Sequence, residues 1–531
     1  MTVTTDAPSR PPAAPPRAPA WASLLTGAVA AAVALGTSEL LAGLIGPAPS
    51  LVLSVGNGVV ELGAGTPVKD VAIALFGTGE KTALVIGTVV LALVFGAVLG
   101  WVADRVSVVA AGAGLVAFGL LGVGSTLASP LDSTAWAVVI AAAAVAAGVA
   151  VLVRLQARTA RLHLGGASTA GPGEGAAGAR REFLRIALGL AAVGGVVGVL
   201  GRTLNGRSRV ASVRSTVTLP PAATAPEVPE AVSFEGIDGL TPFFTPNEDF
   251  YRIDTALMAP SVDVATWSLR VHGMVDTEVS LTYDDLLALE QFEADVTIAC
   301  VSNEVGGDLI GTARWQGVRL ADVLAMAGVQ DGADQVVGRA VDGWTAGFPT
   351  EVALDGRDAM IAVAMNGEPL PVEHGFPARL IVPGLYGYVS ATKWLQDIEL
   401  TTWEAFDGYW VPRGWAKEGP VKTQSRIDVP RRGADVQPGR VVIAGVAWAQ
   451  HRGVARVEVQ IDDGPWQAAE LADELNVDTW RQWRLEWDAA EGDHLIRVRA
   501  TDADGMTQSE APVPVAPDGA EGYHARSIRV A

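Results

Sequence analysis

The chain has almost no cysteine, since Cys300 is the only one among its 531 residues. One thiol cannot form an intrachain disulfide, and the lack of further cysteines excludes a zinc ribbon, a c-type haem attachment site and an iron–sulfur ligand set. Histidine is also scarce, and none of the six lies in a predicted membrane helix: His163, His272, His374, His451, His494 and His524. A haem held by two histidines inside a membrane is therefore excluded.

Basic residues are in short supply as well, with 38 Lys and Arg against 58 Asp and Glu. The resulting net charge of -20 argues against nucleic acid as a partner. The mean hydropathy is nevertheless positive, at +0.31. A strongly charged chain that is apolar on average indicates two unlike parts, one suited to a membrane and one to water.

Long apolar runs fill residues 21–204, after a Pro- and Ala-rich tail at 1–20 that we expect to be disordered. The loop 47–80 is apolar and glycine-rich, and we expect it to lie along the membrane interface. Glu39 falls in the first run, where a carboxylate marks either a functional site or, as we favour, a helix-end or partnered residue. Five runs are long enough to cross a bilayer as helices, at about 22–46, 82–102, 106–128, 135–155 and 183–204.

Arginines set the predicted orientation, because positively charged loops stay in the cytoplasm. The loop between the fourth and fifth runs carries Arg154, Arg158, Arg161, Arg180 and Arg181. This predicts a multi-pass protein of the cytoplasmic membrane, with everything after about residue 205 on the extracytoplasmic side. The pair Arg180-Arg181 before "EFL" also resembles a twin-arginine export signal, which serves domains folded around a cofactor. An ordinary topology anchor is the alternative.

The part after the membrane region reads as a linker and two domains. Residues 205–240 form a Pro-rich linker. Residues 241–424 mix short strands with helices, among them a helix after Ser280 or Thr282, and this texture predicts an α+β domain. Residues 425–531 carry short alternating runs separated by turns, which predicts an all-β immunoglobulin-like sandwich.

Cys300 lies where an apolar, β-prone run, "ADVTIA", meets a polar turn, "SNEVGG". A strand that ends in such a loop is a common place for chemistry. The alternative is that the thiol is only a small buried hydrophobic group.

Three segments together resemble the sulfite oxidase family of molybdopterin enzymes, and the likeness covers most of residues 240–531. They are "TPNEDFYR" at 245–252, the cysteine segment, and "MNGEPLPVEHGFPARLIVPGLYGYVSATKWL" at 365–395. The resemblance implies an α+β core, a C-terminal dimerisation domain and a molybdenum–molybdopterin cofactor. It assigns Cys300 as the metal ligand, in line with the preference of soft metals for thiolates.

The resemblance also implies a set of site residues. The catalytic group comprises Cys300, Arg252 and Asn303. Arg379 and Lys393 suit an anionic phosphate, the first by its fork of donors and the second as a point charge. The cofactor-binding group comprises Asn247, Phe250, Tyr251, Thr345, His374, Arg379, Ser390, Ala391, Thr392 and Lys393.

The segment after the cysteine departs from the family pattern. Sulfite-oxidising members carry a motif like Cys-Ala-Gly-Asn-Arg-Arg, whereas Glu304 and Val305 stand here where two arginines would be. A carboxylate works against binding sulfite, which is a dianion near neutral pH. Arg252 keeps one cation near the expected site, and Arg314, Lys417 and Arg426 are candidates for others.

These features predict a membrane-anchored molybdopterin oxidoreductase that catalyses two-electron oxygen-atom transfer on a small molecule, as sulfite-type oxidation or as S-oxide or N-oxide reduction. It would exchange electrons with an external carrier, a cytochrome or a quinone-linked protein, and could form a homodimer. One alternative is a non-catalytic, membrane-tethered binding module on a vestigial molybdopterin fold. Another is that the membrane helices themselves act as a transporter or as a dock for an electron partner.

Overall fold

The computed structural model describes residues 18–45, 49–63, 80–127, 133–164, 174–204 and 213–531. The chain divides into two compact units, residues 1–208 and 209–531. Most of the predicted tail and most of the loop 47–80 lie outside the described residues. Each unit is described by itself.

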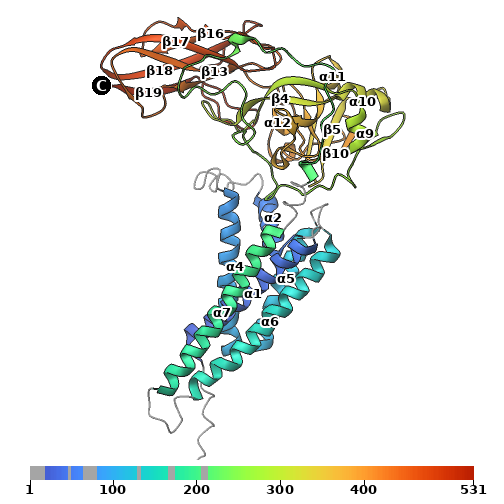
Figure 1. Cartoon of the computed structure of the whole chain (residues 1–531), viewed down its shortest axis with the longest axis vertical. Helices are drawn as coiled ribbons and strands as arrows, with labels where there is room; N and C mark the ends of the chain where they lie inside the picture. The colour runs from blue at the N-terminus through green and yellow to red at the C-terminus, as the bar shows by residue number, and fades with distance from the viewer. Residues whose placement is uncertain (1–17, 46–48, 64–79, 128–132, 165–173, 205–212) are drawn as a thin grey trace, which may run out of the picture. The chain divides into compact units, whose positions relative to one another are not determined.

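The first unit is a bundle of helices (Figure 1). Five of its described helices are long and apolar enough to cross a membrane, which confirms the five predicted ones. The fourth continues past its predicted end at 155, so His163 lies in its last turn, beyond the apolar span that ends at Thr159. The six described helices are α1 (Ala20–Ile45), α2 (Leu51–Gly63), α4 (Glu80–Arg105), α5 (Val108–Thr126), α6 (Thr134–Leu164) and α7 (Glu174–Leu204).

Helix α1 contacts α4, α6 and α7, and glycines bring it unusually close to α7. A Cβ atom added at Gly36 would lie 2.2 Å from the carbonyl oxygen of Gly194, and one at Gly43 would lie 2.2 Å from that of Gly201. Small residues permit this approach of two backbones, which is how helices pack tightly in lipid. Glycines at these positions therefore allow α1 and α7 to pack closely.

Glu39 is buried in α1 and has two partners. The hydroxyl of Ser50, at the start of α2, donates to its carboxylate at 2.8 Å, and Nε of Arg202 on α7 lies 3.4 Å away. This confirms the favoured interpretation of Glu39 as a partnered residue. The carboxylate ties together three helices at one end of the bundle.

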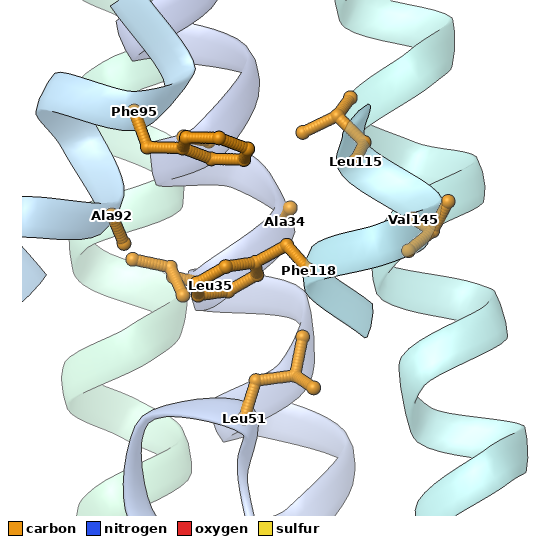
Figure 2. Close-up of a pocket in the computed structure, with 9 residues that line it drawn as sticks. Ala34, Leu35, Leu51, Ala92, Phe95, Leu115, Phe118 and Val145 are labelled. Carbon is orange, nitrogen blue, oxygen red and sulfur yellow. The ribbon is translucent and has the colours of Figure 1, made fainter. Parts of the chain in front are cut away.

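A small cavity of about 20 Å³ lies among the helices. Figure 2 shows apolar side chains from several helices around it. Without polar partners, such a space is expected to stay dry, and these residues offer a ligand nothing to hold. It is lined by Ala31, Ala34, Leu35, Leu51, Ala92, Phe95, Leu115, Phe118 and Val145.

The second unit begins with a mixed sheet, an antiparallel sheet and short helices. One sheet has the order β2-β1-β10-β5-β6, formed by Val279–Thr282, Ser268–Gly273, Leu395–Thr401, Gln335–Ala340 and Thr345–Pro349. The other has the order β3-β4-β7-β8, formed by Phe292–Ala299, Ile310–Arg319, Met360–Met365 and Glu368–Pro369, with β9 (Arg379–Ile381) paired to β7. The helices are α9 (Tyr283–Ala288), α10 (Leu320–Ala327), α11 (Thr350–Leu354) and α12 (Gly387–Ser390).

Local sequence explains where these elements start. Helix α9 begins after Thr282, as predicted, because Thr282 and Asp285 form a capping box in which each side chain accepts from the other's backbone amide. Behind the strands, Trp315 is fully buried and Phe250 nearly so. The buried side chains of both sheets belong to one continuous core, which fixes the strand ends that carry the site.

The remaining strands form two C-terminal sheets, which confirms the predicted strands (Figure 1). The first has the order β11-β13-β17-β16, from Gln424–Val429, Gly439–Trp448, Arg481–Ala489 and Glu470–Leu471. The second has the order β12-β19-β18-β14-β15, from Asp435–Val436, His524–Val530, Gly492–Asp502, Val454–Ile461 and Gln467–Ala468. Buried side chains of both, including Ile443 and Val457, share one core.

Strand β3 lies at the edge of its sheet, and a loop between two C-terminal strands covers it. The amide of Thr297 donates to the carbonyl of Asp478 at 2.9 Å, and its hydroxyl accepts from the amide of Trp480 at 2.7 Å. The side chain of Asn476 donates to the carbonyl of Asp295 at 3.0 Å. Residues almost two hundred positions later in the chain therefore hold the strand that leads to Cys300.

Candidate active site

Cys300 directly follows β3 and is buried. Its amide donates to the carbonyl of Leu309 at 2.9 Å, and its own carbonyl accepts from the amide of Asn303 at 3.0 Å. The amide of Ser302 lies 3.4 Å from the sulfur. A thiolate at this position would thus lie at the start of a hydrogen-bonded turn, with one backbone amide beside it.

The turn after Cys300 is fixed from both sides. Within it, the side-chain oxygen of Asn303 accepts from the amide of Leu309 at 2.9 Å. From the C-terminal sheets, Nη1 of Arg426 donates to the carbonyl of Gly307 at 2.9 Å, and the ring of His524 lies against Gly306. The side-chain oxygen of Asn303, predicted to be catalytic, therefore closes the loop.

An aromatic wall lies behind the cysteine. Phe250 stacks on Tyr251 with ring centres 5.3 Å apart, and meets Trp315 and His374 edge to face at 5.8 and 5.6 Å. Burial raises the pKa of the Tyr251 phenol, and the negative charge of the nearby Cys300 thiolate raises it further. Tyr251 is therefore a neutral hydroxyl next to the candidate ligand.

His374 is buried and neutral. Burial, then the charge of Arg379, lowers the pKa of its imidazole to about 4. Its Nε2 lies 3.0 Å from the carbonyl of Asn247, so the proton resides on that nitrogen. The side-chain nitrogen of Asn247 donates to Glu368 at 2.6 Å, so this amide contributes to holding the segment 245–252 in place.

Arg379 begins β9 in a fully buried position. Its Nη1 donates to the carbonyl of His374 at 3.0 Å, and its guanidinium lies 5.0 Å from the centre of the Trp315 ring. Burial lowers its pKa to about 10, so it is still charged at neutral pH. Its Nε is buried and makes no hydrogen bond to any described residue.

Two further cations share one carboxylate. Nε of Arg252 and Nζ of Lys393 each lie 2.8 Å from Oδ2 of Asp254. Burial lowers the pKa of Lys393 to about 8, against the opposing effect of Asp254. The Nη2 of Arg252 is buried without a hydrogen bond to any described residue.

The other predicted cofactor residues lie at the end of α12, directly after it, and at the start of β6. Ser390 donates to the carbonyl of Tyr386 at 3.0 Å, at the end of α12. Ala391 and Thr392 follow and are buried, and the Thr392 hydroxyl makes no hydrogen bond among the described residues. Thr345 starts β6, the strand that α12 contacts.

Sequence reasoning missed Asp254, Asp342 and Trp315. Burial raises the pKa of Asp342, which lies near Lys393. A signal was available for Asp254, because a carboxylate two residues after Arg252 in an otherwise apolar run needs a cationic partner if it is buried. The sequence does not distinguish Trp315 from other aromatic residues of strands, because its contact with Arg379 depends on the tertiary fold.

The donor set fits a molybdopterin group. Buried polar atoms are normally hydrogen-bonded, so an unpartnered one in a native fold needs an explanation. Arg252 Nη2, Arg379 Nε and the Thr392 hydroxyl are three such atoms. Two belong to cations, as a phosphate requires, and a single thiol lies in the same domain to bind a soft metal.

Comparisons with known proteins agree with this fit. A family model described as an oxidoreductase molybdopterin binding domain matches residues 256–410. Mouse (Mus musculus) mitochondrial sulfite oxidase is 33% identical over 322 residues, covering 51% of this chain and 58% of its own length. The chain thus spans little more than half of that relative.

Two further proteins are similar. A Bacillus subtilis (strain 168) protein named uncharacterized oxidoreductase YuiH is 38% identical over 157 residues, covering 30% of this chain and 76% of its own. The sulfane dehydrogenase SoxCD from Paracoccus pantotrophus has a TM-score of 0.49 at 22% identity, covering 58% of this chain and 90% of that one. The family match and the curated relatives imply a molybdenum–molybdopterin cofactor, and the chain belongs to the sulfite oxidase family of molybdopterin-dependent oxidoreductases.

Proposed function

We propose that this protein is a membrane-anchored molybdopterin oxidoreductase that catalyses two-electron oxygen-atom transfer on a small molecule outside the cytoplasmic membrane. The observation that carries the proposal is the buried group of unpartnered donors on Arg252, Arg379 and Thr392, in the same domain as the lone thiol Cys300. A domain without a cofactor would have little reason to bury cationic donors unsatisfied.

Bound molybdopterin would supply the two-electron redox chemistry. The chain's own residues hold and orient it: Cys300 through its thiolate, Arg379 and Lys393 through their charges, and Tyr251 through a neutral hydroxyl. In one direction, sulfite and water become sulfate, two protons and two electrons. In the other, an S-oxide or N-oxide takes two protons and two electrons and gives the reduced compound and water. A cytochrome or a quinone-linked protein would exchange the electrons.

Electrostatics favour an uncharged oxide over sulfite. Arg314 is bound to Asp295 by two hydrogen bonds of 2.8 Å, and Nε of Arg426 donates to Asp428 at 2.7 Å. Lys417 donates to the carbonyl of Phe406 at 2.7 Å and to a neighbouring carboxylate. The three cations that were to replace the family's arginine pair are thus committed elsewhere, and Glu304 is exposed with its negative charge.

We further propose the placement and assembly of the protein. The five apolar helices would cross the membrane, with Arg154, Arg158, Arg180 and Arg181 on the cytoplasmic side. The arginine pair, in the first part of α7, would serve as a twin-arginine signal, so that the second unit crosses the membrane already folded. The domain bounds 241–424 and 425–531 remain our prediction, with the C-terminal sheets as an immunoglobulin-like dimerisation domain.

The first test is the molybdenum content of protein purified from native membranes, measured per polypeptide beside Cys300→Ser. Ser302→Ala, two residues away in the same turn, is the matched control. We expect about one metal per chain in the wild type and the control, and far less in Cys300→Ser. Turnover of S-oxides, N-oxides and sulfite then identifies the direction.

Two results would contradict the proposal. Molybdenum that is equal in all three proteins would show that Cys300 is not the ligand. No molybdenum in any of them, from cells shown to make the cofactor, would favour a non-catalytic binding module tethered to the membrane.

A further inference from the structure

Asp254 occupies a position that nothing above assigns to the chemistry. Its side chain is only 4% exposed, and one of its oxygens accepts from both Arg252 and Lys393 at 2.8 Å. Lys393 also donates to the carbonyl of Glu373 at 3.3 Å. One carboxylate thus fixes a cation that lies two residues before it in the chain and another that lies 139 residues after it.

The surroundings hold more positive than negative charge. The charged and titratable groups that act on Lys393 are Asp254, Arg252, Arg379, Asp342 and His374. His374 is neutral, and Asp342 is a second carboxylate near Lys393, with a pKa that burial raises. The partly exposed Arg252 and the buried Arg379 and Lys393 therefore face two carboxylates, of which Asp254 bridges Arg252 and Lys393.

Such a surplus of buried charge is costly unless an anion completes it. The unpartnered Nη2 of Arg252 and Nε of Arg379 are the donors that an anion would take up. Oxyanions are the ligands that match a guanidinium fork together with a lysine point charge.

We propose that these residues form a preformed oxyanion site in which Asp254 is the positioning residue, holding Arg252 and Lys393 ready for a ligand's phosphate or sulfite oxygens. The inference rests on the proposed function and deepens it, because it names the residue that prepares the site. The ligand is a tetrahedral or pyramidal oxyanion, and its source is either the cofactor's phosphate or an anionic substrate.

The test uses the full chain purified from native membranes. Asp254→Asn keeps the shape and one acceptor but removes the charge, and Asp254→Glu keeps the charge. Asp397→Asn is the matched control, because Asp397 pairs with the half-exposed Arg270 in the same domain. Molybdenum and pterin are measured per chain, the latter by the fluorescence of its oxidised product. The KM and kcat for sulfite are measured on the fraction of each protein that contains the cofactor.

If the site holds the cofactor's phosphate, Asp254→Asn lowers molybdenum and pterin together by about tenfold, while Asp254→Glu retains most of both. If the site holds an anionic substrate, both contents stay at the wild-type level in Asp254→Asn, and the KM for sulfite rises about tenfold with kcat unchanged. Either result, with Asp397→Asn unaffected, supports the proposal. The second would also overturn the preference for uncharged oxides.

The proposal is overturned if Asp254→Asn is folded and changes neither cofactor content nor the KM for sulfite. If Asp254→Asn does not fold, Asp254→Glu decides, because a folded Asp254→Glu that loses the cofactor shows that charge at this position does not prepare the site. Failure of the proposed function looks different, since the wild type itself would then lack molybdenum.

Discussion

His524 offers a quantitative test of how the C-terminal sheets support the cysteine turn. Its Nδ1 accepts from the amide of Ile427 at 2.9 Å, and its ring lies against Gly306. Burial, then the charges of Arg526 and Arg426, lowers the pKa of this imidazole to about 4. Protonation would remove the acceptor and place a third positive charge beside two arginines.

The sign of the pH effect follows from proton binding. Below about pH 6.5 the unfolded chain protonates His524 whereas the folded chain does not, so the free energy of unfolding falls as pH falls towards 4. The full shift corresponds to about 3 kcal/mol, of which about 2 kcal/mol is lost between pH 7 and pH 5. His374 has a pKa lowered to a similar value and adds a similar loss.

The variant is His524→Asn, because the asparagine oxygen replaces Nδ1 as the acceptor for Ile427 but does not titrate. Urea unfolding of the unit 209–531, followed by tryptophan fluorescence at pH 7 and pH 5, gives the free energy at each pH. We expect the loss between these pH values to be about 2 kcal/mol smaller in the variant than in the wild type. An equal loss in both proteins would refute the reasoning.

His494→Asn is a control with the opposite sign. His494 pairs with Asp462 at 2.9 Å, and this hydrogen bond raises the pKa of the imidazole. The stability that the pair contributes is therefore fully present below about pH 6.5 and is lost as pH rises through the folded-state pKa. Removing it should weaken the protein more at pH 5 than at pH 8.

Three further changes test other parts of the molecule. Gly201→Val should force α7 away from α1 and destabilise the protein by about 1–3 kcal/mol, which would lower its melting temperature in detergent. An unchanged melting temperature would contradict the close packing. Trp480→Phe leaves the carbonyl of Phe243 without its 2.9 Å donor, so urea unfolding should show a loss of about 1–3 kcal/mol, whereas a neutral effect would mean that water replaces the indole. Asn303→Ala removes the hydrogen bond from the amide of Leu309, so urea unfolding should show a loss of about 1 kcal/mol, and the molybdenum content per chain should fall. An unchanged molybdenum content would show that the turn closes without the Asn303 side chain.

Much of the fold could be predicted because its signals are local. Long apolar runs predicted the five long apolar helices, the capping box at Thr282 predicted α9, and alternating runs predicted the C-terminal strands. The helix α2 was not predicted, although Ser54, Asn57 and Glu61 recur at helical spacing in it, because its glycines indicated a loop. The cover of β3 was also missed, since the bond from Thr297 to Asp478 joins residues far apart in the chain.

The roles assigned to the site residues remain predictions, whereas the arrangement of these residues depends on the tertiary fold. Motif residues such as Tyr251, His374 and Arg379 are indeed brought together by the core. The bridging role of Asp254 could not be predicted, because it depends on Lys393 arriving from a distant strand end. The family pattern likewise could not reveal that Arg426 already has partners in this chain.

The covering of β3 has a consequence for how the chain can be divided. An edge strand whose backbone groups lack partners is a template for pairing with another molecule, and it promotes aggregation. Cut before residue 425, the molybdopterin domain would lose Asn476, Asp478 and Trp480 and expose the strand that leads to Cys300. The change in sequence pattern near residue 425 is therefore not a safe point of truncation, and the two parts must be expressed as one piece.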